Sequence, residues 1–386
     1  MLELDCGAEF DAAREEEFFA ALPARPAVYA IQPRDGRGQP FLSRTADLRR
    51  SAERLLRAPE AATKRLNLRA VAARIRYRIA GSRFEQSLTL YQTARKLSPR
   101  HYRGFLRLRP AALLKVNLRN EYPRCYITRR ILSDGGFYVG PFHSRKAAES
   151  FANEFLDLFH MRRCQIKIRR DPTFPGCIYS EMKMCPGPCF AGCTREEYDA
   201  EAERAVRALD SAAASVEEEL EREREAASAG LDFERASAIH RKLEKARGVL
   251  RGLPEIARRA DRLEAVILQR AAEEDAVAVF VVRGGIIADP FVLRFAELSA
   301  QPRSVEEMVR ENLQSEEARA PETEGNYRAR YAIAAPAAGT LEEHLWLLAR
   351  WYYSKPREGE IFFPAPAWPY RRIVRACSRL LAPGTA

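Results

Sequence analysis

Five of the eight cysteines lie within thirty residues of each other. They are Cys164, Cys177, Cys185, Cys189 and Cys193. Thiolates are preferred ligands of zinc and of iron–sulfur clusters, so this spacing is typical of a metal site. Prolines and glycines between the cysteines prevent a long helix or strand there. A loop with so little regular structure buries no core of its own, and a bound metal would hold it in place.

The gaps between the cysteines favour one kind of metal site. Twelve residues separate Cys164 from Cys177, seven separate Cys177 from Cys185, and three separate Cys185 from Cys189. Four thiolates match the four irons of a [4Fe–4S] cluster. A Zn²⁺ ion in a Cys₄ site is the alternative, although zinc ribbons use shorter ligand spacings. Cys193 is a further thiol that can compete as the fourth ligand, and ordinary buried thiols are the simplest interpretation.

The charge of the chain favours a polyanionic partner. The 386 residues carry a net charge of +11. The excess is local, because eighteen Lys or Arg face four acids between Arg44 and Arg109. Such a concentration indicates DNA binding through phosphates, which gives affinity without base specificity. The candidate DNA-binding residues are Arg44, Arg49, Arg50 and Arg54. The alternative is an arginine-rich surface without a ligand.

The N-terminus and the hydropathy predict a cytoplasmic protein. The first nineteen residues are acidic and lack the apolar stretch of a signal peptide. No apolar run reaches the ~18 residues of a membrane span, so we expect no membrane partner. In the cytoplasm, clustered cysteines bind metal more often than they form disulfides.

Hydrophobic periodicity predicts an α/β (α+β) multidomain fold, because 386 residues are too many for one ordinary core. The N-terminal part alternates helices with strands. The helices are expected over 11–22, 47–56 and 83–97, and the strands over 26–31, 41–42 and 71–79. Hairpins are expected at Asp134-Gly135, between strands over 125–132 and 137–139, and at Gly284-Gly285. The chain then divides into five segments: 20–105, 106–163 (β-hairpin and helix), 164–194 (cysteine loop), 195–255 (helical hairpin) and 256–386 (α+β).

The helical hairpin is expected to dock onto another helix. Its helices, 217–226 and 233–250, are joined at residues 228–230. Gly230 suits a left-handed stop of the first helix, and Asp232 suits the N-cap of the second. An apolar stripe on the second helix is too small to form a core alone. It should pair with a partner helix or with the preceding helix of this chain.

The order of these segments resembles the UvrC excinuclease family of bacterial nucleotide excision repair. The resemblance runs from about residue 20 to residue 365. It depends on the stretches LPARPAVYAI, FLSRTADLRRSAERLL, EYPRCYITRRILSDGGFYVGPFHS, LDFERASAIHRKLEKAR and DAVAVFVVRGG, together with the cysteines between them.

This resemblance implies that 20–105 is a nuclease domain of the GIY-YIG type, which uses two tyrosines, an arginine and a glutamate that holds a divalent ion. Tyr29 matches the first tyrosine, and Arg44 matches a lysine position. The other three positions are substituted: the second tyrosine by Phe41, the arginine by Ser51 and the glutamate by Leu90. Loss of the metal ligand and of the charge stabiliser together predicts an inactive scaffold. Whether the protein is an enzyme is therefore an open question at this point.

Two alternatives stay open as well. Arg50 and Glu85 are candidate displaced replacements, which would make the protein an active endonuclease with a shifted site that uses Mg²⁺ or Mn²⁺. The other alternative is a redox-responsive DNA-binding protein outside repair. The resemblance also implies a ribonuclease H-like nuclease domain after residue 365. The short remainder, WPYRRIVRACSRLLAPGTA, predicts that this second incision site is missing too.

The resemblance further implies two binding sites. Cys164, Cys177, Cys185 and Cys189 match the positions that are taken to hold a [4Fe–4S] cluster in the family. The helical hairpin matches the UVR motif, which binds the helicase UvrB. The partner-binding residues would be Phe233, Glu234, Arg235, Ala236, Ile239 and Leu243, with Phe233, Ile239 and Leu243 as apolar anchors. The expected function is a repair protein that binds DNA and UvrB and makes no incision itself.

Overall fold

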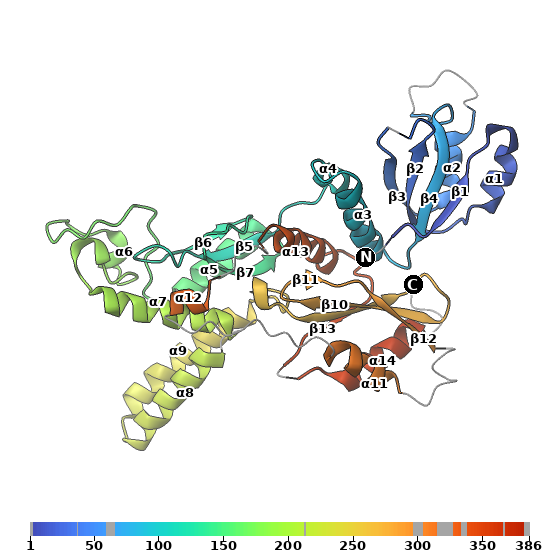
Figure 1. Ribbon diagram of the computed structural model, residues 1–386. Helices are drawn as coiled ribbons and strands as arrows, with labels where there is room; N and C mark the ends of the chain where they lie inside the picture. The colour runs from blue at the N-terminus through green and yellow to red at the C-terminus, as the bar shows by residue number, and fades with distance from the viewer. Residues whose placement is uncertain are drawn as a thin grey trace.

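The computed structural model describes residues 3–36, 38–58, 66–211, 214–295, 304–314, 327–332, 338–365 and 367–381. In this part of the chain, helices combine with three antiparallel sheets (Figure 1). The predicted α+β multidomain fold is confirmed. No helix of the described residues is long and apolar enough to cross a membrane.

The first sheet contains a strand that the sequence patterns did not indicate. Its strand order is β1 (Cys6–Glu9), β4 (Ala72–Ile79), β2 (Ala27–Pro33) and β3 (Phe41–Thr45). β1 is short and carries no alternation of apolar and polar residues, so only its pairing with β4 identifies it. The first sheet therefore starts before residue 20. Three helices accompany it: α1 (Glu15–Ala21), α2 (Leu48–Leu56) and α3 (Arg83–Leu97).

The two faces of this sheet belong to different cores. Because side chains alternate along a strand, Tyr29 and Ile31 of β2 pack with α1 and α2. Val28 and Ala30 lie in the core that contains α3. That second core continues into the C-terminal part of the chain, where it includes Trp351. The segment 20–105 thus shares one of its cores with residues near the other end of the chain.

The second sheet corrects the hairpin expected at Asp134-Gly135. Its order is β6 (Cys125–Thr128), β5 (Ala112–Val116), β7 (Phe137–Phe142) and β8 (Arg258–Arg259). β5 lies between β6 and β7, so the two strands that flank the turn do not pair with each other. The Asp134 carboxylate instead contacts the Lys115 ammonium and accepts hydrogen bonds from Gly136 N (3.2 Å) and the Tyr138 hydroxyl (3.1 Å). These contacts fix the turn as a connection across β5.

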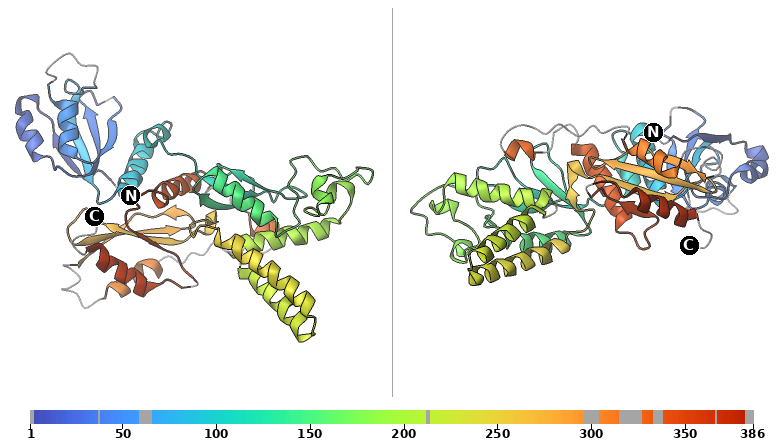
Figure 2. Two further views of the ribbon diagram at one scale, coloured as in Figure 1. Left: turned by 180° about the vertical axis from the view of Figure 1, so that it is seen from behind. Right: turned by 90° about the horizontal axis from the view of Figure 1, so that it is seen from below.

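Helices dominate the middle of the chain. α5 (Arg145–Leu156) follows the second sheet, and α6 (Ile178–Glu181) lies within the cysteine loop. α7 (Arg195–Asp210) leads to the antiparallel pair α8 (Ala214–Ala229) and α9 (Phe233–Arg251). This pair projects away from the sheets (Figures 1 and 2). Its free end is therefore accessible to a partner.

The third sheet has helices on both faces. Its order is β11 (Ile286–Ile287), β10 (Ala276–Arg283), β9 (Ala265–Arg270) and β13 (Glu360–Phe362), and β12 (Phe291–Arg294) also pairs with β10. The expected turn at Gly284-Gly285 is confirmed, and both glycines have positive φ. One face packs against α13 (Ala338–Tyr352). The other packs against α11 (Val305–Gln314) and α14 (Tyr370–Leu381).

Candidate functional sites

The tyrosine of the expected nuclease site is buried beside hydroxyl groups and one arginine. Tyr29 lies opposite Ser43 of β3 and is 1% exposed. Burial raises the pKa of Tyr29, while its neighbours Ser43, Arg54 and Ser51 act in the opposite direction. The phenol is therefore protonated at neutral pH. It can donate a hydrogen bond, but it is no nucleophile in this state.

The substituted positions do not all lie together. The Phe41 ring centroid is 6.2 Å from that of Tyr29, and Ser51 Oγ lies 2.6 Å from Thr45 Oγ1 near the same face of the sheet. Leu90 is 5% exposed and lies in the other core, the one that contains α3. The structure thus brings Tyr29, Phe41 and Ser51 together, and it leaves Leu90 apart from them.

The two candidate replacements, Arg50 and Glu85, do not lie beside the Tyr29 hydroxyl either. Glu85 is 5% exposed and accepts a hydrogen bond from Gly81 N at 2.8 Å. Burial raises the pKa of Glu85, and the Arg78 guanidinium, 3.8 Å away, partly offsets this. The guanidinium near the Tyr29 hydroxyl belongs to Arg54 rather than to Arg50. Sequence reasoning missed Arg54 as the arginine near Tyr29. Helical spacing could have indicated it, because Arg54 follows Ser51 by three residues and lies on the same side of α2.

The four candidate DNA-binding arginines lie on two surfaces. Arg44 of β3 pairs with Val28, points to the α3 side and donates to Ser87 Oγ at 2.9 Å. Arg49 donates to the carbonyls of Leu22 (2.8 Å) and Ala20 (3.2 Å) and so holds the end of α1. Arg50 and Arg54 are exposed on α2. The structure therefore separates Arg44 from the other three.

The four predicted metal ligands line one cavity. Cys164, Cys177, Cys185 and Cys189 surround a volume of about 250 Å³, and Cys193 is not among its described lining residues. All eight cysteines are free thiols. Among the described residues, no group of three or more His, Cys, Asp or Glu side chains stands in an arrangement that could hold a metal ion. The cysteines therefore share a cavity without converging on one point.

A buried arginine organises the chain before the first cysteine. Arg162 is 4% exposed and donates from Nε to the Tyr122 carbonyl at 2.8 Å. Its Nη1 donates to the Ile166 carbonyl at 2.9 Å and lies 3.7 Å from Cys164 Sγ. Further along, Ser180 Oγ donates to the Cys177 carbonyl at 2.6 Å. Side-chain hydrogen bonds to the backbone thus hold two of the cysteines in this irregular loop.

Two thiols of the cavity, those of Cys185 and Cys189, have raised pKa values. Burial raises the pKa of Cys185 to about 11, and the nearby thiols of Cys164, Cys177 and Cys189 add to the effect. Burial also raises the pKa of Cys189. A metal that binds here would have to displace the protons of these two thiols, so its affinity would increase with pH.

The helical hairpin buries most of its predicted anchors. Ile239 is 5% exposed and Leu243 is fully buried, in the core that also contains Leu220 of α8. Ala236 is buried as well, whereas Glu234 and Arg235 are exposed. Phe233 is 66% exposed. Of the three predicted apolar anchors, Phe233 alone is accessible in the closed hairpin.

The turn of the hairpin differs by one residue from the expectation. The left-handed position is occupied by Leu231 (φ +58°), not by Gly230. Gly230 N still donates to the Ala226 carbonyl at 3.0 Å, so the helical hydrogen bonding extends one residue further. The predicted N-cap is confirmed, since Asp232 Oδ1 accepts from Arg235 N at 3.0 Å. Leu231, which is 74% exposed, adds a second apolar side chain to the tip beside Phe233.

Comparison with known proteins identifies relatives of the chain. Residues 112–208 match the family model described as UvrC/Cho excinuclease, middle domain. The UvrABC system protein C of Nitratidesulfovibrio vulgaris is 27% identical over 288 residues, which are 71% of this chain and 40% of that protein. The protein of the same name from Dehalococcoides mccartyi is 27% identical over 271 residues, 69% of this chain and 44% of the relative.

A third relative, the UvrABC system protein C of Oleidesulfovibrio alaskensis, is 29% identical over 184 residues, 46% of this chain and 25% of that protein. The chain thus spans less than half the length of these curated relatives. No solved structure matches it. The family-model match over residues 112–208, together with relatives that cover up to 71% of this chain, supports a UvrC-family protein.

Proposed function

We propose that this protein acts in nucleotide excision repair by binding DNA and a UvrB-type helicase, and that its N-terminal domain makes no incision. The observation that carries the second part is the surroundings of Tyr29. Among the described residues, the groups that act most strongly on the pKa of its hydroxyl are Ser43, Ser51 and Arg54, and none of these three is a carboxylate. Leu90, at the position of the metal-binding glutamate in the resemblance, lies in the opposite core.

The chemistry of phosphodiester cleavage explains why these substitutions matter. A divalent ion in such a site stabilises charge on the phosphate and orients the attacking nucleophile. Mg²⁺ takes oxygen ligands, and a leucine side chain offers none. Glu85 does not replace the carboxylate, because it is buried and bonded to Gly81 N. Arg54 supplies a guanidinium near Tyr29, but a guanidinium does not bind a metal cation.

An incision assay tests this proposal. The full chain would be incubated with Mg²⁺ or Mn²⁺, the helicase and lesion-bearing duplex DNA. We expect stable binding of the DNA and no nick above the background of the Tyr29→Phe variant. A nick that wild type makes and Tyr29→Phe does not would contradict the proposal and favour the shifted-site endonuclease.

We further propose that Cys164, Cys177, Cys185 and Cys189 hold a [4Fe–4S] cluster. Their common cavity supports this choice over zinc. A tetrahedral Zn²⁺ site with Zn–S bonds of about 2.3 Å needs its four sulfurs within about 4 Å of one another. A cluster occupies a volume between its ligands, because each thiolate binds a different iron. When bound, the cluster would cross-link the loop.

The cysteine outside the cavity provides a matched control. We expect anaerobically purified protein to absorb at about 400 nm and to contain iron and sulfide. Cys185→Ser should lose most of the iron, whereas Cys193→Ser should retain it. Equal loss of iron in both variants would indicate that Cys193 is a ligand as well. A colourless protein with one zinc per chain would support the Cys₄ zinc site.

A further inference from the structure

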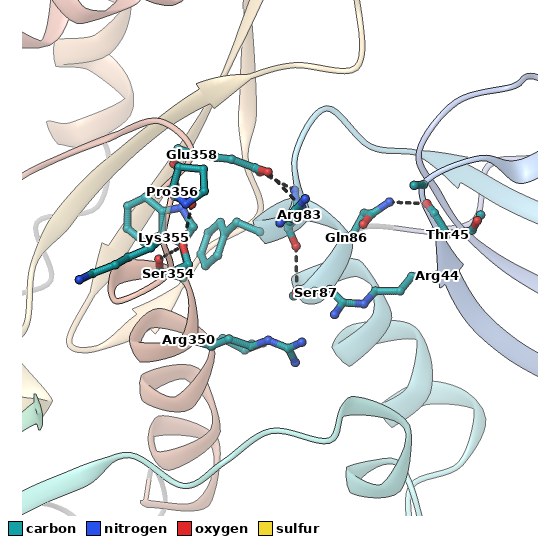
Figure 3. A pocket seen from close by; sticks show the side chains of 14 residues that line it. Arg44, Thr45, Arg83, Gln86, Ser87, Arg350, Ser354, Lys355, Pro356 and Glu358 are labelled. Atoms are coloured by element: carbon teal, nitrogen blue, oxygen red, sulfur yellow. Dashed lines mark hydrogen bonds and ion pairs between the residues drawn. The ribbon is translucent and has the colours of Figure 1, made fainter. Parts of the chain in front are cut away.

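A positively charged cavity lies between the N-terminal domain and the C-terminal part of the chain. Its volume is about 400 Å³ (Figure 3). β3 and α3 form one side, and α13 with the turn after it forms the other. Its charged lining residues are Arg44, Arg83, Arg350, Lys355 and Glu358. Four cations therefore face a single acid among the described residues of the lining.

The single acid neutralises only one of these cations. Glu358 Oε1 lies 3.4 Å from Arg83 Nε, and its Oε2 accepts from Arg83 N at 2.8 Å. Arg44 donates to a hydroxyl, Ser87 Oγ, and Arg350 donates to a carbonyl, that of Leu106 at 3.1 Å. Both hydrogen bonds involve neutral acceptors, so the positive charges of Arg44 and Arg350 are not balanced within the described residues.

These two arginines extend toward each other from opposite walls (Figure 3). Burial, together with the positive charges of Arg350 and Arg83, lowers the pKa of Arg44. Two like charges that share a partly desolvated space raise the free energy of the folded protein. An anion between them would remove this repulsion. Lys355 belongs to the lining as well, but its ammonium turns away from the pair in Figure 3.

The walls of the cavity are fixed by contacts between the same elements. The rings of Phe84 and Trp351 pack with their centroids 5.3 Å apart. Trp351 Nε1 donates to the Glu358 carbonyl at 2.8 Å, and Gln86 Nε2 donates to the Thr45 carbonyl at 2.7 Å. The arginines therefore project from packed elements, which keeps their positions set before any ligand binds.

We propose that this cavity binds a phosphate group of DNA through Arg44 and Arg350. A guanidinium presents paired N–H donors that match phosphate oxygens. The proposal rests on the DNA binding proposed above and adds a specific contact to it. DNA is favoured over a free nucleotide because Lys355, a lining residue that Glu358 does not pair with, is exposed and extends the positive charge from the cavity to the surface. A DNA backbone that crosses the cavity would contact both the Arg44–Arg350 pair and this surface charge.

The test is the salt dependence of DNA binding by the full chain. Fluorescence anisotropy with a labelled duplex would compare wild type, Arg44→Gln/Arg350→Gln and the control Arg145→Gln. Arg145 is exposed on α5, where it pairs with Glu149. Each lost phosphate contact reduces the slope of log affinity against log salt by about 0.9. Because both arginines would bind the same phosphate, we expect the double variant to lose about 0.9 from the slope and the control to lose none.

A second measurement separates loss of contact from loss of fold. Without DNA, the double variant should melt at the temperature of the wild type or above it, because the repulsion is removed. The variant Arg350→Lys should have a slope between those of the wild type and the double variant, because lysine keeps the charge but lacks the paired N–H donors of arginine. A double variant that is folded and has the wild-type affinity and slope would overturn the cavity proposal and leave DNA binding intact.

The remaining outcomes concern the source of the phosphate. If wild type binds no DNA, the DNA part of the proposed function fails. Inorganic phosphate and a deoxynucleoside triphosphate would then be tested by thermal shift. A shift in wild type that is absent in the double variant would assign the cavity to a free phosphate compound, contrary to the DNA contact. No shift with either probe would overturn phosphate binding at this cavity altogether.

Discussion

At the scale of single residues, the packing around Leu90 bears on the proposal that the N-terminal domain makes no incision. For the site that the resemblance implies, a carboxylate that holds the divalent ion would have to lie on the side of the sheet that carries Tyr29. Leu90 lies instead among apolar side chains of the core that includes Leu88 and Phe84. The packing around Leu90 therefore has no place for a charge.

This position gives the first prediction. Leu90→Glu would put a carboxylate into a site that is 5% exposed. We expect it to lower the free energy of unfolding by about 3 kcal/mol and to give no Mn²⁺ binding, since the burial of an unpaired charge is costly. Leu90→Met, which keeps the volume, should cost less than about 1.5 kcal/mol. Urea unfolding and Mn²⁺ titration provide the measurements, and a Leu90→Glu variant that is stable and binds Mn²⁺ would contradict the prediction.

His344 makes the stability of the fold depend on pH. Its Nδ1 accepts a hydrogen bond from Ile287 N at 2.8 Å. Burial, together with the positive charge of Arg95, lowers the pKa of His344 to about 4, and Glu343 acts in the opposite direction. In the unfolded chain the pKa is about 6.5. Below that pH the unfolded state binds a proton that the folded state does not, so stability falls as the pH falls.

The expected size follows from the same two pKa values. Between about pH 6.5 and about pH 4, His344 should account for a loss of about 3 kcal/mol in the free energy of unfolding. His344→Asn retains a hydrogen-bond acceptor and has no titratable group, so its stability should change less over this range. Urea unfolding at several pH values would show the difference. Parallel curves for wild type and variant would mean that His344 is not the group responsible.

At the scale of elements, the tip and the interior of the α8–α9 hairpin should respond differently to substitution. Phe233 is exposed, so Phe233→Ala should change the free energy of unfolding by less than about 0.5 kcal/mol. If the tip docks onto UvrB, this variant should still weaken capture of the helicase by about tenfold or more. Leu243→Ala removes a fully buried side chain and should cost about 2–5 kcal/mol.

Binding measured on both variants distinguishes the two parts of the hairpin. Capture lost in Leu243→Ala alone, with Phe233→Ala unaffected, would show that the partner requires the folded hairpin but does not contact its tip. The interior of the hairpin would then be the docking surface, which requires α8 and α9 to separate. Circular dichroism of each variant shows whether the helices persist.

Most elements could be predicted from the sequence, but not all of their neighbours. α3 was expected over 83–97 and spans Arg83–Leu97, because Ser82 caps it and Pro99 follows its end. Local signals of this kind lie within a few residues of each other. The pairing of β5 between β6 and β7 depends on residues farther apart, so Asp134-Gly135 looked like a hairpin turn. The short strand β1 was missed for the same reason.

The candidate sites show the same division. The spacing of the cysteines predicted a metal site, and the resemblance singled out the four that line one cavity. The grouping of Arg44 with Arg49, Arg50 and Arg54 followed their closeness in sequence, and the sheet separates them. The cavity that joins Arg44 to Arg350 combines residues from opposite ends of the chain. No local pattern indicates such a pair.

At the scale of the whole molecule, one buried carboxylate links the first hundred residues to the third sheet. Glu343 of α13 is 2% exposed. Its Oε2 accepts from the Tyr91 hydroxyl at 2.9 Å, and its Oε1 accepts from Arg103 Nε at 2.7 Å and from the Tyr102 hydroxyl. Because these donors come from α3 and the residues after it, Glu343 connects the N-terminal domain to α13.

This connection determines whether the two ends of the chain unfold together. Glu343→Ala leaves Arg103 and two hydroxyls without their acceptor. Because the Arg103 side chain is 59% exposed, we expect the cost of unsatisfied partly buried hydroxyls, about 1–3 kcal/mol, rather than that of a broken buried ion pair. We expect faster amide hydrogen exchange in both α3 and α13. The exposed pair of Glu149 with Arg145 is the control, so Glu149→Ala should alter neither helix. Faster exchange in α13 alone would show that the apolar core around Phe84 and Trp351 holds the two parts together without this carboxylate.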